Sequence, residues 1–165
     1  MAYDRDKIEE FWKNKEQFYG EKLLHRSIAQ TLSRREPSYI GLLFLMEEHL
    51  YFEYTTGGRK SILDMLVNKF REEKKKEQRV ISIPNREIIN VGIISTRAAK
   101  SFIKKWGKTS KELKEYIGDR KSKLLDRIIF GTSLCIVTND KYYVFQTPED
   151  KQWVKVLKEH ISSLT

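Results

Sequence analysis

Residues 142–164 decide the fold of this chain, and they read YYVFQTPEDKQWVKVLKEHISSL. The segment opens with aromatic and β-branched residues, which are typical of a strand. Thr147 can cap a helix, and Pro148 suits a first helical turn because that position needs no backbone N–H. Apolar residues then recur at helical spacing, at Trp153, Val154, Leu157, Ile161 and Leu164. The pattern predicts a helix over 148–164 that follows the last strand directly and packs on the sheet.

Paired apolar segments upstream predict the rest of this sheet. Two β-rich segments, 131–138 and 141–146, are separated by Asn139-Asp140, and both turn residues tolerate the backbone of a tight hairpin. Residues 39–46 are apolar on both sides, which predicts a strand buried on both faces that forms a hairpin with 50–54. Further strands are predicted at 22–32, 79–83, 88–95 and 98–106.

Helices are predicted at three places outside these strands. Asp4 can cap a helix over 4–19, which Gly20 ends. Capping-box spacing predicts helical insertions near 61–77 and 107–129. The apolar side of the first helix is expected to contain Ile8, Phe11, Trp12, Phe18 and Tyr19. We expect one domain, with an N-terminal helical extension over 1–19, strands with insertions over 20–147, and the closing helix over 148–164.

Three pairs of segments resemble the pleckstrin-homology-like superfold, most closely its bacterial PH-like and GRAM-type members. These pairs are 41–45 with 50–52, 81–84 with 87–91, and 142–148 with 153–157. The resemblance implies an α+β fold of about seven antiparallel strands in two packed, nearly orthogonal sheets, closed by a C-terminal helix. In phosphoinositide-binding members the loop between the first two strands carries several basic residues, and here that loop contains Arg34 and Arg35.

The positive charge of the chain is concentrated in residues 97–127. The whole chain has a net charge of +9, and this segment contains eleven basic and four acidic side chains. One interpretation is a surface for an anionic partner, and the other is a solvated face that only aids solubility. The candidate anion- or partner-binding residues are Arg34, Arg35, Lys104, Lys105, Lys108, Lys111 and Lys114.

The sequence does not contain a recognisable catalytic or metal-binding pattern. Its three histidines, His25, His49 and His160, are far apart, and none has the spacing of a helical metal pair. The glycines near 57–61 do not have the spacing of a phosphate-binding loop. Cys135 lies within a predicted strand, with no adjacent base to activate it. We therefore expect no enzymatic activity, no cofactor and no metal.

Cysteine use and hydropathy set the expected location. A single cysteine excludes a disulfide framework and favours a reducing compartment. The longest apolar run, 39–46, is too short to span a bilayer as a helix. We expect a cytoplasmic protein, with the inner face of a membrane as a further option.

These observations favour a non-catalytic binding or adaptor module for a protein partner or an anionic membrane surface. The alternative is a nucleic-acid-binding protein that uses segment 97–127, with its lysines on phosphates and Trp106 stacked on a base.

Overall fold

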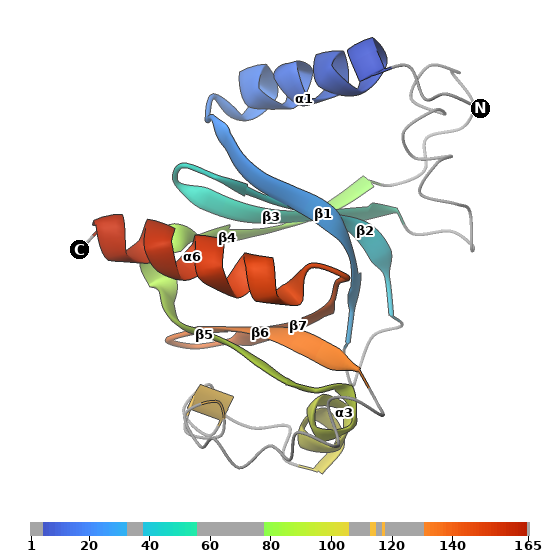
Figure 1. The fold of residues 1–165 in the computed structure, drawn as a ribbon, viewed down its shortest axis with the longest axis vertical. Coiled ribbons are helices and arrows are strands. Elements are labelled where there is room, and N and C mark those ends of the chain that lie inside the picture. The colour runs from blue at the N-terminus through green and yellow to red at the C-terminus, as the bar shows by residue number, and fades with distance from the viewer. Residues whose placement is uncertain are drawn as a thin grey trace.

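The computed structural model describes residues 5–32, 38–55, 78–105, 113–114, 117 and 131–164 (Figure 1). The predicted insertion near 61–77, most of the one near 107–129, and residues 33–37 of the loop that contains Arg34 and Arg35 lie outside these residues. The elements are α1 (Arg5–Tyr19), β1 (Leu23–Thr31), β2 (Ile40–Met46), β3 (His49–Thr55), β4 (Gln78–Pro84), η2 (Asn85–Glu87), β5 (Ile88–Ser95), α3 (Thr96–Lys105), β6 (Thr132–Thr138), β7 (Tyr142–Gln146) and α6 (Asp150–Leu164).

The seven strands form one antiparallel sheet, in the order β4-β3-β2-β1-β7-β6-β5. Strand β1 pairs with β2 along most of its length, and it pairs with β7 only at Gln30 and Thr31. This short pairing joins the two halves of the sheet by hydrogen bonds. The predicted number of strands and their antiparallel order are confirmed, whereas the predicted division into two packed sheets is not, because β1 belongs to both halves.

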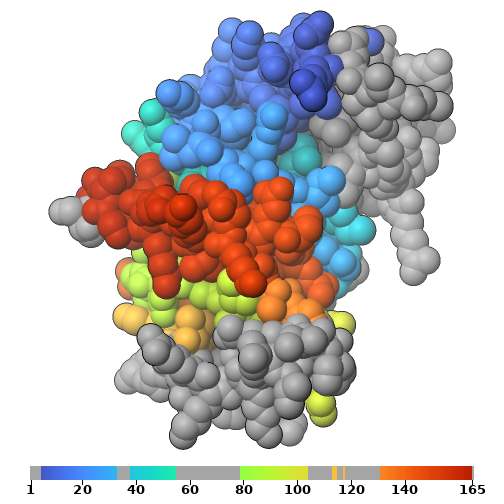
Figure 2. All heavy atoms as spheres, in the orientation of Figure 1, coloured from blue at the N-terminus to red at the C-terminus, as the bar shows by residue number. Residues whose placement is uncertain are grey.

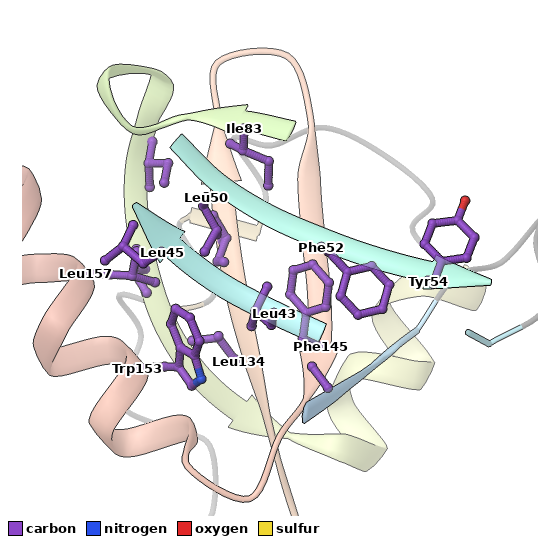
Figure 3. Packing of buried hydrophobic residues seen from close by; sticks show 14 residues of the cluster. Leu43, Leu45, Leu50, Phe52, Tyr54, Ile83, Leu134, Phe145, Trp153 and Leu157 are labelled. Atoms are coloured by element: carbon purple, nitrogen blue, oxygen red, sulfur yellow. The ribbon is translucent and has the colours of Figure 1, made fainter. Parts of the chain in front are cut away.

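The sheet curls so that its two halves face each other. Phe52 of β3 and Phe145 of β7 are three strand positions apart in the sheet, which would be about 14 Å if the sheet were flat. Their ring centroids are nevertheless 5.2 Å apart. Figure 3 shows these two rings side by side, with Leu43 and Leu134 of opposite halves nearby. The inner faces of the two halves therefore form one shared core.

Helix α6 fills the space between the two halves. Trp153 and Leu157 point from α6 into the core and are completely buried (Figure 3). The indole Nε1 of Trp153 donates a hydrogen bond to Ser27 Oγ at 2.7 Å. The predicted closing helix and its apolar stripe are confirmed as far as Ile161, which packs on the core. Leu164 is 51% exposed and does not belong to the packed stripe. The helix begins at Asp150, two residues later than predicted.

Helix α1 covers the outer face of β2 and β3. Residues Leu43 and Leu45 of β2 point into the core between the sheet halves, while Phe44 and Met46 pack beneath α1 with Trp12. This arrangement confirms that the strand over 39–46 is buried on both faces. Phe18 was predicted to lie on the packed side of α1, but it is 79% exposed. Gly20 follows the helix with a φ of 70°, which a glycine adopts without steric cost.

The prediction of a strand over 98–106 is wrong, because residues 96–105 form α3. Ser95 Oγ accepts a hydrogen bond from the backbone N–H of Ala98 at 3.1 Å, which caps the start of the helix. Ala99, Phe102 and Ile103 recur at helical spacing and pack on the outer face of β6. Strand β6 is therefore also covered on both faces.

A buried ion pair fixes α1 on the sheet. The Nζ of Lys15 donates to both carboxylate oxygens of Glu53, and both residues are almost fully buried. Tyr19 Oη donates to Glu53 Oε1 at 2.6 Å, and the pKa of Tyr19 is raised by burial and by this carboxylate. The ammonium group of Lys15 also lies 5.9 Å from the ring centroid of Phe44. Satisfied in this way, the buried charges are tolerated.

His25 packs against Trp153 at the junction of β1 and α6. The centroids of the two rings are 4.5 Å apart, and His25 Nε2 lies 3.5 Å from Glu149 Oε2. Within the described residues, this buried nitrogen makes no hydrogen bond. Burial lowers the pKa of His25, and the carboxylate of Glu149 opposes this shift. The folded state therefore favours the neutral imidazole.

The first prediction concerns the core. Replacing Trp153 with alanine should reduce the free energy of unfolding by about 3–5 kcal/mol, because it leaves a large cavity between the sheet halves. Trp153→Phe keeps a ring but removes the donor to Ser27, so it should cost less. Ser27→Ala is the matched control for the lost hydrogen bond. Urea denaturation measures all three, and an unchanged midpoint for Trp153→Ala would contradict this role of α6.

The second prediction concerns the ion pair. Lys15→Met leaves Glu53 buried without its cation and should cost about 3–5 kcal/mol. The double variant Lys15→Met/Glu53→Met removes both charges, so it should recover most of that loss. Denaturation of the two variants and the unchanged protein tests the pair. Equal losses in the single and double variants would show that packing, and not the unpaired charge, sets the cost.

The third prediction concerns pH. The folded pKa of His25 lies below its ordinary value of 6.5, so protonation favours unfolding. The contribution of His25 to stability should be complete above pH 6.5 and should be lost as the pH falls from there through the folded pKa. His25→Phe, which keeps a ring against Trp153, should flatten this decline, and His160→Gln should not. A decline of the same steepness in His25→Phe would contradict the assignment.

Candidate partner-binding groove

A groove lies between the edge strand β5 and helix α6. It has a volume of about 300 Å³, which is at the small end of the range for ligand sites. Figure 2 shows α6 in red above the yellow-green surface of β5. The groove is lined by Asn90, Val91, Gly92 and Ile93 of β5, by Val154 and Lys158 of α6, and by Ile117.

The position of β5 in the sheet produces this groove. Strand β5 is the last strand in the sheet order, and among the described strands it pairs with β6 alone. Helix α6 packs against β5 through the same core that holds Trp153 and Val91. An edge strand beside an amphipathic helix leaves a channel whose walls are one strand and one helix. This is the arrangement to which an extended peptide can add as a further strand.

The wall opposite α6 depends on a glycine. A Cβ atom on Gly92 would lie 2.1 Å from Cγ2 of Ile117, which is closer than any real contact. Ile117 therefore packs directly on the backbone of β5. A larger residue at position 92 would displace Ile117 and change the width of the groove.

The structure describes residues 97–105, 113–114 and 117 of the predicted basic segment. Helix α3 exposes Arg97 and Lys100 on the side opposite its packed residues, and Lys114 is also exposed. Lys104 and Lys105 belong to the last turn of α3, where the backbone alone is described. Arg34, Arg35, Lys108 and Lys111, like Trp106, lie outside the described residues. The structure therefore does not test whether the seven candidate residues form one surface.

A second depression lies where β1 and β7 separate. It has a volume of about 580 Å³ and is lined by Ile28, Ala29, Gln30, Ile40, Thr132, Gln146, Thr147, Pro148 and Asp150. The carboxylate of Asp150 is buried and accepts a hydrogen bond from Thr132 Oγ1. Thr147 Oγ1 lies 2.9 Å from Ser27 Oγ. Three of its polar side chains, Thr132, Thr147 and Asp150, thus make internal contacts, and the β5–α6 groove is the better candidate.

Cys135, His49 and His160 were considered above as catalytic or metal-binding residues, and each is buried or hydrogen-bonded within the fold. Cys135 is buried, and burial raises the pKa of its thiol far above neutrality. His49 Nδ1 lies 2.8 Å from Glu21 Oε1, and His160 Nε2 donates to the carbonyl of Glu47 at 2.8 Å. Burial opposes ionisation of Glu21, but hydrogen bonds from the backbone of Glu48 and from Tyr51 and His49 outweigh it and lower its pKa.

The described residues show neither a metal-binding cluster nor a membrane-spanning helix. They contain no group of three or more His, Cys, Asp or Glu side chains placed to hold a metal ion. Of the helices in this part of the chain, none has both the length and the apolar character needed to cross a membrane.

The sequence analysis predicted neither the groove nor Lys158, the lysine that lines it. The strand over 88–95 was predicted, but its place at the sheet edge depends on pairings distant in sequence. A usable signal was present in α6, where Lys151, Lys155 and Lys158 recur at helical spacing opposite the apolar stripe. Lys15 also carried a signal, because it lies three residues after Trp12 and four before Tyr19, on the packed side of α1.

No protein-family model and no curated protein sequence matches this chain. Among solved structures, the C-terminal domain of an unknown protein from Leishmania infantum is 15% identical, with a TM-score of 0.49, over 93% of this chain and 96% of that one. The linker-DH/PH domains of p115-RhoGEF are 10% identical, with a TM-score of 0.45, over 88% of this chain and 30% of that one.

The DH/PH domains of PDZ-RhoGEF, in complex with GTP-γ-S activated RhoA, are 9% identical, with a TM-score of 0.46. That match covers 99% of this chain and 35% of the other. Two of the three similar structures thus contain a pleckstrin-homology domain, the superfold that the sequence resembles, and similarity to GRAM-type members stays a prediction. At these identities and TM-scores, the similarity carries no argument about the partner of this chain.

Proposed function

We propose that this chain is a non-catalytic binding module that holds an extended segment of a protein partner in the β5–α6 groove. The observation that carries the proposal is the groove itself, which combines an edge strand with apolar helix and loop side chains. A bound segment would run beside β5 and place alternate side chains between Val154 and Ile117.

Both components of such binding are present in the groove. Backbone hydrogen bonds along an edge strand give affinity with little dependence on sequence. Specificity comes from the side-chain surfaces, and Val154, Ile117 and Ile93 supply apolar contact on both sides of the strand. The wall formed by α6 is held by Trp153, so the groove is expected to exist before the partner arrives, which reduces the entropic cost of binding.

The anionic membrane surface and the nucleic acid remain alternatives that rest on segment 97–127. Arg97, Lys100 and Lys114 are exposed, as either alternative requires. Neither alternative uses the β5–α6 groove, so a change confined to the groove separates them from the proposed function. The quadruple change of Lys104, Lys105, Lys108 and Lys111 to glutamine should weaken binding to vesicles or nucleic acid, and it should leave the groove unaffected.

The fourth prediction tests the groove. Random 12-residue peptides displayed on phage should yield binders when selected on the full chain. These peptides should bind Val154→Arg at least about tenfold more weakly, because the longer side chain occupies the groove while its charged end reaches water. Gln152→Arg is the matched control, since it adds the same side chain to an exposed position on another side of α6. Isothermal titration calorimetry measures the affinities, and circular dichroism verifies the fold.

Two outcomes would overturn the proposed function. One is a set of selected peptides that bind Val154→Arg and the unchanged protein equally well. The other is a selection without binders from a protein that sediments with phosphatidylserine vesicles or shifts single-stranded RNA at low salt. The second outcome would support the basic-segment alternatives.

A further inference from the structure

A row of lysines runs along α6. Lys151, Lys155 and Lys158 are separated by four and three residues, so they lie on one side of the helix, and all three are exposed. Within the described part of the chain, no carboxylate lies within ion-pair distance of these three ammonium groups. We call these three residues the lysine row.

The lysine row meets the β5–α6 groove at Lys158. Lys158 is itself one of the lining residues, and Val154, the other lining residue on α6, lies one helical turn before it. Glu159 points about 100° away from Lys158 around the helix axis, but it lies four residues after Lys155, so one exposed carboxylate also stands beside the row. Beyond the opposite wall, exposed Lys114 precedes the lining residue Ile117 by three positions. The exposed side of α6 next to the groove thus carries three lysines and one glutamate, in a chain whose net charge is +9.

The spacing of the row suits an extended segment. In a strand, side chains on the same side repeat at about 6.6–6.8 Å. On α6 the rise from Lys151 to Lys155 is about 6 Å, and that from Lys155 to Lys158 is about 4.5 Å. The flexible lysine side chain can absorb the difference. A strand in the groove would therefore bring every second side chain, all of them on the face toward α6, near one ammonium group.

We infer that the segment bound in this groove is acidic, with Asp or Glu at the alternate positions that face α6 and its lysine row, and apolar residues at the positions between them, which face Ile117. This inference rests on the proposed function, because it assigns the chemistry of the partner to the same groove. Charge complementarity is the argument for the occupant. Rim charges of this kind accelerate association and select among partners, while the apolar contacts retain the complex.

The fifth prediction tests this charge preference with the peptides selected by phage display. Their sequences should be enriched in Asp and Glu relative to the unselected library. The tightest binder is then synthesised in two forms, one unchanged and one with every Asp and Glu replaced by Asn and Gln. The amide form should bind the unchanged protein roughly three- to thirtyfold more weakly at low salt, and added salt should reduce the difference.

The matched variants separate this inference from the proposed function. Lys155→Gln/Lys158→Gln should weaken the acidic peptide roughly three- to tenfold and leave the amide form unchanged. Lys13→Gln/Lys22→Gln is the control, since it removes the same charge from exposed positions on α1 and before β1. If Val154→Arg abolishes binding of both forms but the lysine-row variant affects neither, the groove binds peptides as proposed. The inference that its partner is acidic is then wrong. If the lysine-row variant weakens binding but Val154→Arg does not, the acidic segment binds elsewhere and both proposals fail.

Discussion

The two halves of the sheet close around the indole of Trp153, and the other features of the molecule depend on that closure. Because the halves face each other, β1 has to pair with both of them. Strands β2 and β6 then carry apolar side chains on their outer faces too, so α1 and α3 have to cover them. Because α6 lies between the halves, one side of it borders the edge strand β5, and this leaves the groove.

Local patterns predicted much of the fold, because their physical causes are local. The apolar run at 39–46, the Asn139-Asp140 turn and the helix start at Thr147-Pro148 each specify an element through a few adjacent residues. The error at α3 was also local in origin. Phe102 and Ile103 favour strands, but in the folded chain the helical spacing of Ala99 with them and the cap at Ser95 outweigh this preference. The single sheet could not be predicted from local patterns, because it depends on the contact of Thr31 with Phe145.

The candidate site was less predictable than the fold for the same reason. A count of charges located a basic segment, but a count cannot place side chains on a common surface. The groove depends on three segments that meet only in the folded chain, namely β5, α6 and Ile117. The helical spacing of the lysine row can be seen in the sequence. That Lys158 lies beside β5 cannot, because it depends on how α6 packs in the folded chain.

The ion pair between Lys15 and Glu53 also bears on how the chain selects one structure. Apolar contacts between α1 and the sheet are tolerant of sliding, since one aromatic ring can replace another beneath Trp12. The ion pair is not tolerant, because a helix displaced by one turn would bury an ammonium group without its carboxylate. Its partners are 38 residues apart, so the pair ties the first helix to a strand distant in sequence. The buried charges thus favour the observed alignment of the first helix over a displaced one.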